Sequence, residues 1–188
     1  MSYDLELLPR GRVDEILRHY ESQDADSVVI NPGPSVAERE KWKRRLRDVL
    51  IREEPKFGQF EFDFDEIARI DSISEGEART KYRHVELNLP ESDRSGIQVT
   101  LYDQTVSITI PYWHNQEAAS QVFVRVGRYI ELLEDSGDLV TYDPQVGRIV
   151  RFATDRGEIL RCYLSVMARI PDIVEHSRIQ SKRWWHFW

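Results

Sequence analysis

The stretch from residue 97 to residue 145 limits the possible folds of this chain more than any other part of the sequence. It begins with a predicted hairpin, in which strands Ile97–Tyr102 and Thr105–Ile110 flank Asp103-Gln104 as a two-residue loop. In this register all six apolar side chains share one face of the hairpin. Because this loop contains no glycine, a longer turn with another strand register is the alternative. The facing pairs in the two-residue version are Leu101 with Val106, Val99 with Ile108, and Ile97 with Ile110.

A helix and another strand follow this hairpin. Asn115 is a suitable N-cap for a helix over 116–136, Gly137 is a natural stop, and the chain returns through a strand at Leu139–Tyr142. If this strand pairs in parallel with the second hairpin strand, both strands end at the same edge of one sheet. The apolar stripe of the helix contains Ala119, Val122, Phe123, Val126, Ile130 and Leu133.

Polar and aromatic residues follow both of these strand ends and form the candidate binding site. They are Tyr112, Trp113 and His114 after the hairpin, and Tyr142, Asp143 and Gln145 after the later strand. Because histidine titrates near neutral pH, a small enzyme using His114 and Asp143 in a crevice is one hypothesis. A structural explanation is favoured, since Pro111 ends a strand, Asn115 caps a helix and Asp143-Pro144 makes a turn. No nucleophile is recognisably paired with His114.

The remaining segments predict further strands and helices around this unit. The expected strands are Tyr3–Leu7, 60–65, Val85–Leu89 and 149–152, and residues 71–83 are expected to form a loop. The expected helices cover Val13–Tyr20, a segment that starts at the Ser35/Glu38 capping box, and Leu160–Met167 with a continuation beyond Pro171 to about Gln180.

Two charged patterns are candidate ligand sites. Residues 60–65 alternate phenylalanine with acids, but they lack the further oxygen ligands and the central glycine of an EF-hand loop, so a solvent-facing strand is favoured. A basic run could hold an acidic ligand, but neighbouring acids favour a solvated helix face. The basic residues are Lys41, Lys43, Arg44, Arg45 and Arg47, and the acids are Glu38, Glu40 and Asp48.

Composition excludes several classes of protein. The net charge of −7 argues against a general nucleic-acid binder and fits a basic partner or plain solubility. The single cysteine, Cys162, excludes an internal disulfide and a cysteine-rich zinc site, and we expect an inert thiol. We expect no cofactor, no metal and no catalytic residue, because the usual motifs are missing. The absence of a signal-like start and of a transmembrane segment predicts a cytoplasmic protein.

The C-terminal residues are unusually aromatic. Residues 1–180 are expected to form one domain, and 181–188 a tryptophan-rich tail. Such a density of exposed rings would favour aggregation, so docking onto the domain or contact with a second copy is favoured over contact with a membrane surface. The tail contributes Trp184, Trp185 and Trp188 to the candidate binding residues.

Short motifs resemble those of a group of small uncharacterised bacterial proteins. The resemblance covers Ser2-Tyr3-Asp4-Leu5, the run Gly96–Tyr102, Pro111-Tyr112-Trp113 and Tyr142-Asp143-Pro144-Gln145. Some proteins of this kind accompany toxin–immunity systems. The resemblance therefore implies a bacterial cytoplasmic interaction protein, and it assigns no functional residue.

Together these patterns predict one α+β domain. We expect a mixed, mainly antiparallel sheet with helices packed on one face and a C-terminal helical segment alongside. The leading functional hypothesis is a non-enzymatic protein-binding module of the immunity type, with a protein partner or a homodimer, no nucleic acid and no transmembrane segment.

Overall fold

The computed structural model describes residues 1–22 and 34–184, with side chains at 1–18 and 34–170. Its centre is a seven-stranded sheet in which every described pairing is antiparallel. In spatial order the strands are β2 (Gly58–Gln59), β3 (Val85–Asn88), β4 (Gln98–Leu101), β5 (Val106–Pro111), β1 (Ser2–Pro9), β6 (Leu139–Asp143) and β7 (Arg148–Val150). The helices are α1 (Val13–Ser22), α2 (Val36–Glu53), α3 (Phe64–Asp71), α4 (Glu75–Lys81), α5 (Gln116–Gly137) and α6 (Phe152–Trp184), with short 3-10 turns at Arg10–Arg12 and Glu91–Asp93.

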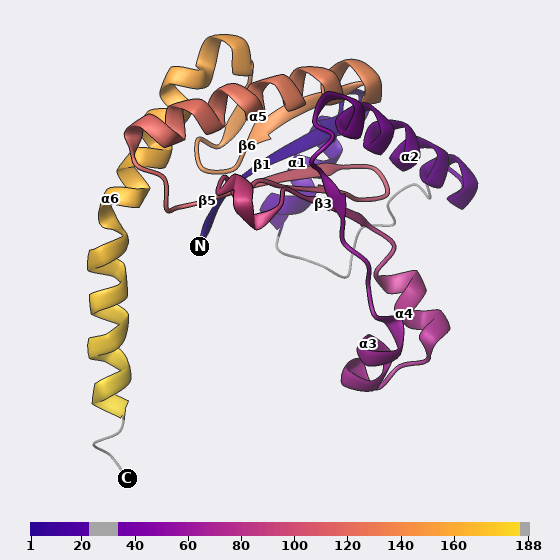
Figure 1. Cartoon of the computed structure of the whole chain (residues 1–188), viewed down its shortest axis with the longest axis horizontal. Helices are drawn as coiled ribbons and strands as arrows, with labels where there is room; N and C mark the ends of the chain where they lie inside the picture. Colours follow the sequence, from indigo (N-terminus) through magenta and orange to yellow (C-terminus); the bar gives the residue numbers. More distant parts are fainter. Residues whose placement is uncertain (23–33, 185–188) are drawn as a thin grey trace.

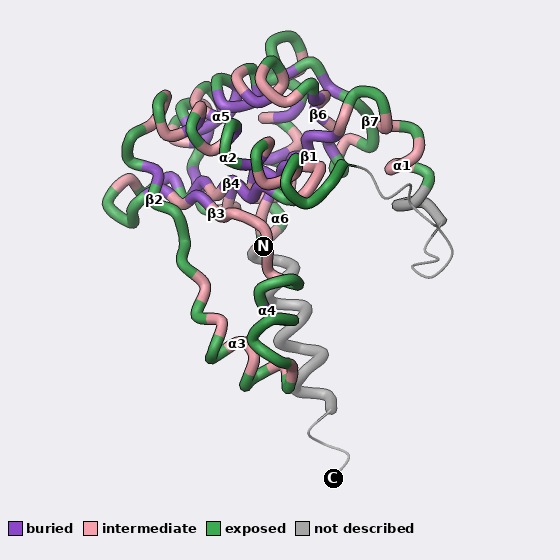
Figure 2. Tube along the Cα trace, turned by 90° about the vertical axis from the view of Figure 1, so that its right-hand side faces the viewer, coloured by how far each residue is buried: buried purple, intermediate pink, exposed green. Residues whose placement is uncertain are grey.

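The helices that build the core cover one face of the sheet. Figure 1 shows α5 and α2 lying across this face, and Figure 2 shows the buried residues gathered between these helices and the strands. Phe123 of α5 contacts Tyr3 of β1 and Phe152 of α6, which joins the three elements through aromatic rings. The predicted α+β domain with helices on one face is therefore confirmed. The single cysteine, Cys162, is half-buried against this core.

The predicted hairpin register is confirmed. Leu101 lies opposite Val106 and Val99 opposite Ile108, and the backbone N–H of Tyr102 donates to the carbonyl of Thr105 at 2.9 Å across the turn. Because strand side chains alternate between faces, the apolar residues of β4 and β5 point to the helices and are buried. The helix predicted after Asn115 is also present, and the Asn115 side chain accepts a hydrogen bond from the backbone N–H of Ala118.

The parallel pairing of β5 with β6, on which the crevice hypothesis depends, does not occur. These strands do run in the same direction, but β1 lies between them and pairs antiparallel with both. In this position Ser2 is opposite Pro111 and Glu6 is opposite Tyr142. Tyr3, Leu5 and Leu7 are fully buried, which explains why β1 takes the central place in the sheet. The sheet is consequently antiparallel and not mixed.

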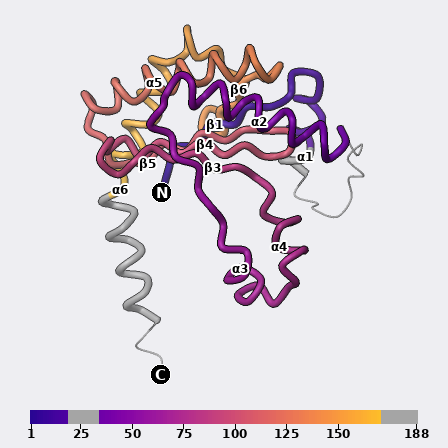
Figure 3. The backbone as a smooth tube through the Cα atoms, turned by 45° about the vertical axis from the view of Figure 1, so that its right-hand side comes forward, coloured from indigo at the N-terminus to yellow at the C-terminus, as the bar shows by residue number. Residues whose placement is uncertain are grey.

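Residues 60–84 form a helical arm in place of the strand and loop expected there. Phe64 opens α3 because the Asp63 side chain accepts a hydrogen bond from the backbone N–H of Glu66, so the alternation of rings and acids ends in a helix cap. Ser74 and Glu77 form a capping box that starts α4. Figures 1 and 3 show the arm on the opposite side of the sheet from α5 and α2. Within the arm only Ala78 is buried.

The helical stretches expected on both sides of Pro171 belong to one helix, α6, which continues to Trp184. Trp184 is therefore the last residue of a helix, and its side chain lies outside the described part. Trp185 and Trp188 lie outside the described residues altogether, so their expected docking role stays a prediction.

Candidate functional site

Asp143, one of the two proposed acid–base residues, has a structural role at the end of β6. It is fully buried, and its Oδ2 accepts a hydrogen bond of 2.6 Å from the hydroxyl of Tyr3. Its Oδ1 accepts hydrogen bonds from the backbone N–H groups of Gln145 and Val146 at 2.9 and 3.2 Å. Burial, followed by this bond to a carboxylate, raises the pKa of Tyr3. The carboxylate therefore holds β1 to the turn after β6.

His114 has different partners. It is 5% exposed, its Nε2 lies 2.8 Å from the carbonyl oxygen of Ser95, and its backbone N–H donates to the hydroxyl of Tyr163 at 3.3 Å. In the described part of the chain no hydrogen bond joins His114 to Asp143. The arrangement fastens the segment before β4 to the end of β5 and lacks the pairing that an acid–base site needs.

The other residues predicted at this end of the sheet also lie in separate environments. Tyr112 is half-buried and stacks on Tyr163 with ring centroids 5.1 Å apart. Trp113 is 65% exposed, and its ring lies over Gly96, whose φ of +62° and lack of a side chain make room for it. Tyr142 belongs to the opposite face of the sheet, since it alternates with the buried Thr141 and Asp143. The sheet end thus forms a structural cluster in which His114 and Asp143 have separate partners.

The face of the sheet turned away from α5 carries the strongest candidate for a functional surface, which we call the acidic face. Two cross-strand rows build it. One row joins Asp4 to Thr109 and Gln98, and the other joins Glu6 to Ser107, Thr100 and Glu86. Thr100 and Ser107 are buried and the other members are half-buried. The same alternation that buries the apolar side chains therefore collects carboxylates, hydroxyls and an amide on the other side.

Hydrogen bonds within the acidic face hold its carboxylates in place. The hydroxyl of Thr109 donates to Asp4 at 2.8 Å, and the amide of Gln98 donates to Glu86 at 2.9 Å. The ring of His84 lies 3.0 Å from the other oxygen of Glu86. Among the described side chains, no lysine or arginine forms an ion pair with Asp4 or Glu6. The face is therefore an ordered, acidic surface, and the described lysine and arginine side chains leave Asp4 and Glu6 without an ion pair.

Glu6 shows the effect of this crowding. Burial, with the neighbouring charge of Asp4, raises its pKa from 4.5 to about 7, although a hydrogen bond from Ser107 acts in the opposite direction. Partial burial and then the charges of Glu6, Glu86 and Asp4 raise the pKa of Tyr102 at the corner of the same face. A cation bound here would relieve this repulsion.

Glu6→Gln is expected to change how stability depends on pH. The native protein keeps the Glu6 proton up to a higher pH than the unfolded chain does, so this residue's stabilising contribution is present below its unfolded pKa and is lost as pH rises through about 7. After allowance for solvent screening, the loss between about pH 5 and pH 8 amounts to roughly 1–2 kcal/mol. Urea unfolding should show this loss in the wild type and in a control, Glu117→Gln on α5, but not in Glu6→Gln. An equal pH dependence in all three proteins would contradict the assignment.

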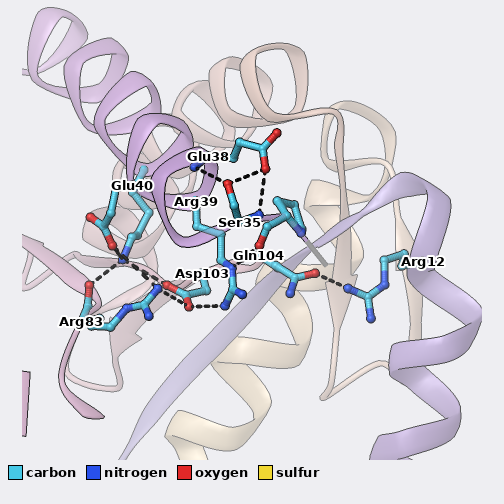
Figure 4. A network of polar contacts seen from close by, with 10 residues as sticks. Arg12, Ser35, Glu38, Arg39, Glu40, Arg83, Asp103 and Gln104 are labelled. Atoms are coloured by element: carbon cyan, nitrogen blue, oxygen red, sulfur yellow. Dashed lines mark hydrogen bonds and ion pairs between the residues drawn. The ribbon is translucent and has the colours of Figure 1, made fainter. Parts of the chain in front are cut away.

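A second polar cluster, around Asp103 of the hairpin turn, binds three cations of its own chain (Figure 4). Lys43 has a fully buried side chain, and its Nζ donates to the carbonyl of Arg83 at 2.6 Å and to Asp103 at 3.1 Å. Arg39 and Arg83 bind the other oxygen of Asp103 at 2.9 and 2.7 Å. Burial alone would raise the pKa of Asp103, but these bonds and charges hold it below its ordinary value. The expectation that Lys43 belongs to a solvated helix face is wrong, because the turn supplies a counter-charge that sequence spacing does not reveal.

A cavity of about 360 Å³ lies beside this cluster, between the end of β1 and the start of α2. Its cationic side chains already have partners within the chain, since Arg12 binds Glu15 and Gln104, and Arg39 binds Asp103 (Figure 4). The cavity therefore offers little free charge to a ligand, and we assign it a structural role. Its lining comprises Pro9, Arg12, Pro34, Glu38, Arg39, Trp42, Asp103, Gln104, Gly137 and Leu139.

Metal and membrane sites receive no support from the described residues. They contain no group of three or more His, Cys, Asp or Glu side chains arranged to hold a metal ion, and no helix among them has the length and apolar character to cross a bilayer. Comparison with protein-family models, curated proteins and solved structures gives no match. The function is consequently argued from the acidic face itself.

Proposed function

We propose that this chain is a non-enzymatic protein-binding module, of the kind an immunity protein exemplifies, that holds a basic partner on its acidic face. The observation that carries the proposal is the pair Asp4 and Glu6, which no described lysine or arginine neutralises although both are fixed in the centre of a sheet. Fixed charges of one sign steer an oppositely charged partner and select against others. The net charge of −7 also favours a basic partner.

The architecture suits such a role. Helices cover the other face of the sheet and form the core there. The sheet is therefore stable with its acidic face uncovered. Side chains on paired strands have little freedom, and their hydrogen bonds restrict them further. A rigid surface loses less conformational entropy when it binds. The buried contacts of His114 and Asp143, by contrast, offer no comparable support for an enzyme.

Neutralising the acidic face tests the proposal. The variant Asp4→Asn/Glu6→Gln/Glu86→Gln removes the charges, and Glu117→Gln/Glu131→Gln/Asp135→Asn removes the same number from exposed positions of α5. Quantitative affinity capture from a lysate of the source organism should recover a basic protein with the wild type and with the α5 variant. We expect the acidic-face variant to recover at least about tenfold less, as each lost charge pair contributes about 0.5–1 kcal/mol.

The ionic strength gives an independent check on the same capture. Recovery by the wild type should fall as salt rises to physiological strength and beyond, because screening weakens exposed charge pairs. The proposal fails if the acidic-face variant captures as much of the partner as the wild type does, or if no specific partner is recovered.

A further inference from the structure

A connected set of aromatic rings runs from the acidic face onto the helical arm. Phe60, Phe62, His84 and Tyr102 follow one another with centroid separations of 5.1, 4.9 and 5.5 Å. The two ends of this series are solvent-accessible, because Phe60 is 49% exposed and Tyr102 is 43% exposed. Exposed rings in contact with one another are typical of binding surfaces and uncommon elsewhere on a monomer.

Rings of the arm already bind cations of their own chain. The guanidinium of Arg79 lies 4.5 Å from the ring centre of Phe64, and the ammonium of Lys81 lies 5.2 Å from that of Tyr82. No such cation lies over Phe60 or Tyr102 in the described part of the structure. Phe60 and Tyr102 can therefore each accept a cation from a partner in the way that Phe64 and Tyr82 accept one from this chain.

The free rings adjoin the carboxylates of the acidic face. The backbone N–H of Phe60 donates to the carbonyl of Glu86 at 2.9 Å, and His84 lies between the side chains of Glu86 and Tyr102. Tyr102 follows β4 and continues the alternation of Gln98 and Thr100, so its side chain lies on the side of the acidic face, where its ring contacts His84. The arm stands on the same side of the sheet as the acidic face (Figures 1 and 3), and the contacts of Phe60 and His84 join its rings to the acids.

The acidic face alone is too small for a stable protein–protein interface. Four neighbouring strands about 4.8 Å apart and about four residues long cover roughly 250 Å². A stable protein–protein interface buries about 800 Å² on each partner. A partner held on the acidic face must therefore reach beyond it, and the adjoining arm presents exposed apolar surface on that side, including Phe60 and Ile70.

Resting on the proposed function, we propose that the helical arm and the acidic face form one docking surface for an arginine-bearing segment of a partner protein. Its guanidinium groups stack on Phe60 and Tyr102 and pair with Glu86 and Glu6. Arginine suits this surface better than lysine, because a guanidinium is planar, stacks on rings and binds a carboxylate through two N–H groups at once. The charge of the surface excludes an acidic segment.

Two short fluorescent peptides of equal length and charge test this proposal, one alternating glycine with arginine and the other glycine with lysine. We expect the wild type to bind the arginine peptide about fivefold more tightly, as stacking on two exposed rings predicts. The variant Phe60→Leu/Tyr102→Leu should lose the preference for arginine and bind both peptides about equally, because arginine gains more from the rings than lysine does. Val124→Ala, which removes exposed apolar surface from α5, should behave as the wild type. Thermal melts establish that each variant is folded.

The acidic-face variant separates this proposal from the proposed function. It should weaken the binding of both peptides by about tenfold. If the wild type binds both peptides equally, or if the ring variant keeps the preference for arginine, the docking inference is wrong, and the acidic-face variant still reports on the proposed function. If the wild type binds neither peptide, the docking inference is wrong, and affinity capture with the acidic-face variant decides the proposed function.

Discussion

Replacement of Asp103 by alanine is expected to lower the free energy of unfolding by about 3 kcal/mol. Asp103 occupies the turn of the β4–β5 hairpin and receives Lys43, Arg39 and Arg83. Its loss leaves the fully buried Lys43 ammonium with one carbonyl and the partly exposed Glu40 as partners. Among the described side chains, Glu40 is then the one carboxylate left beside a buried ammonium that water cannot reach, so losing Asp103 costs far more than losing an exposed counter-ion.

Urea unfolding of three variants measures this effect. Glu66→Ala breaks an exposed ion pair with Arg69 and should cost less than about 1 kcal/mol. Lys43→Met keeps the shape of the side chain, and the double variant Lys43→Met/Asp103→Ala should be more stable than the sum of the single effects predicts by at least about 1 kcal/mol. Simple additivity, or an Asp103→Ala effect no larger than that of Glu66→Ala, would show that the buried ammonium does not depend on this carboxylate.

The local parts of the fold could be predicted because short-range physics decides them. In the β4–β5 hairpin the alternation of apolar and polar residues assigns one face to the core, and the short loop after Leu101 then sets the register. The cap at Asn115 and the capping box at Ser35 and Glu38 depend on neighbouring residues only. The Ser74/Glu77 capping box carried the same signal for α4, and the composition of residues 71–83 obscured it.

The long-range parts could not be predicted because they depend on which segments meet. Nothing in the β5–α5–β6 stretch indicates that β1, about a hundred residues earlier, enters between its strands. The strand expected at residues 60–65 does not form, because Asp63 caps helix α3. Over so short a run, the same residues fit the two-residue period of a strand as well as the start of a helix. Lys43 resembles its solvated neighbours in sequence, and only the folded hairpin shows the carboxylate that admits it to the interior.

The difference between local and long-range features also explains how far the candidate site could be predicted. His114 and Asp143 stand out in the sequence as polar residues after strands, and they are polar because they fasten the end of the sheet. The acidic face was visible as the polar half of the alternation in four strands, but ordinary solvent-facing strands have that pattern too. What distinguishes it is the strand order, which places Asp4 and Glu6 of β1 in the middle of the sheet beside β5.

Asp143→Ala is expected to destabilise the protein by about 3 kcal/mol, although this residue takes no part in the proposed binding. The substitution removes the acceptor of the Tyr3 hydroxyl, which is fully buried, and of two backbone N–H groups in the turn after β6. An unpaired buried hydroxyl alone costs about 1–3 kcal/mol. Asp143→Asn keeps an acceptor oxygen and should cost only about 1 kcal/mol.

The partner variant Tyr3→Phe makes this prediction specific to the hydrogen bond. Alone it should cost about 1–2 kcal/mol, since the buried carboxylate loses one donor. Combined with Asp143→Ala it should add almost nothing, because the hydroxyl that the single substitution leaves unpaired is then absent. Additive losses in urea unfolding would mean that the two side chains act separately. Binding of the arginine peptide by Asp143→Asn should equal that of the wild type, because Asp143 points to the helix-covered side of the sheet and the acidic face lies on the other.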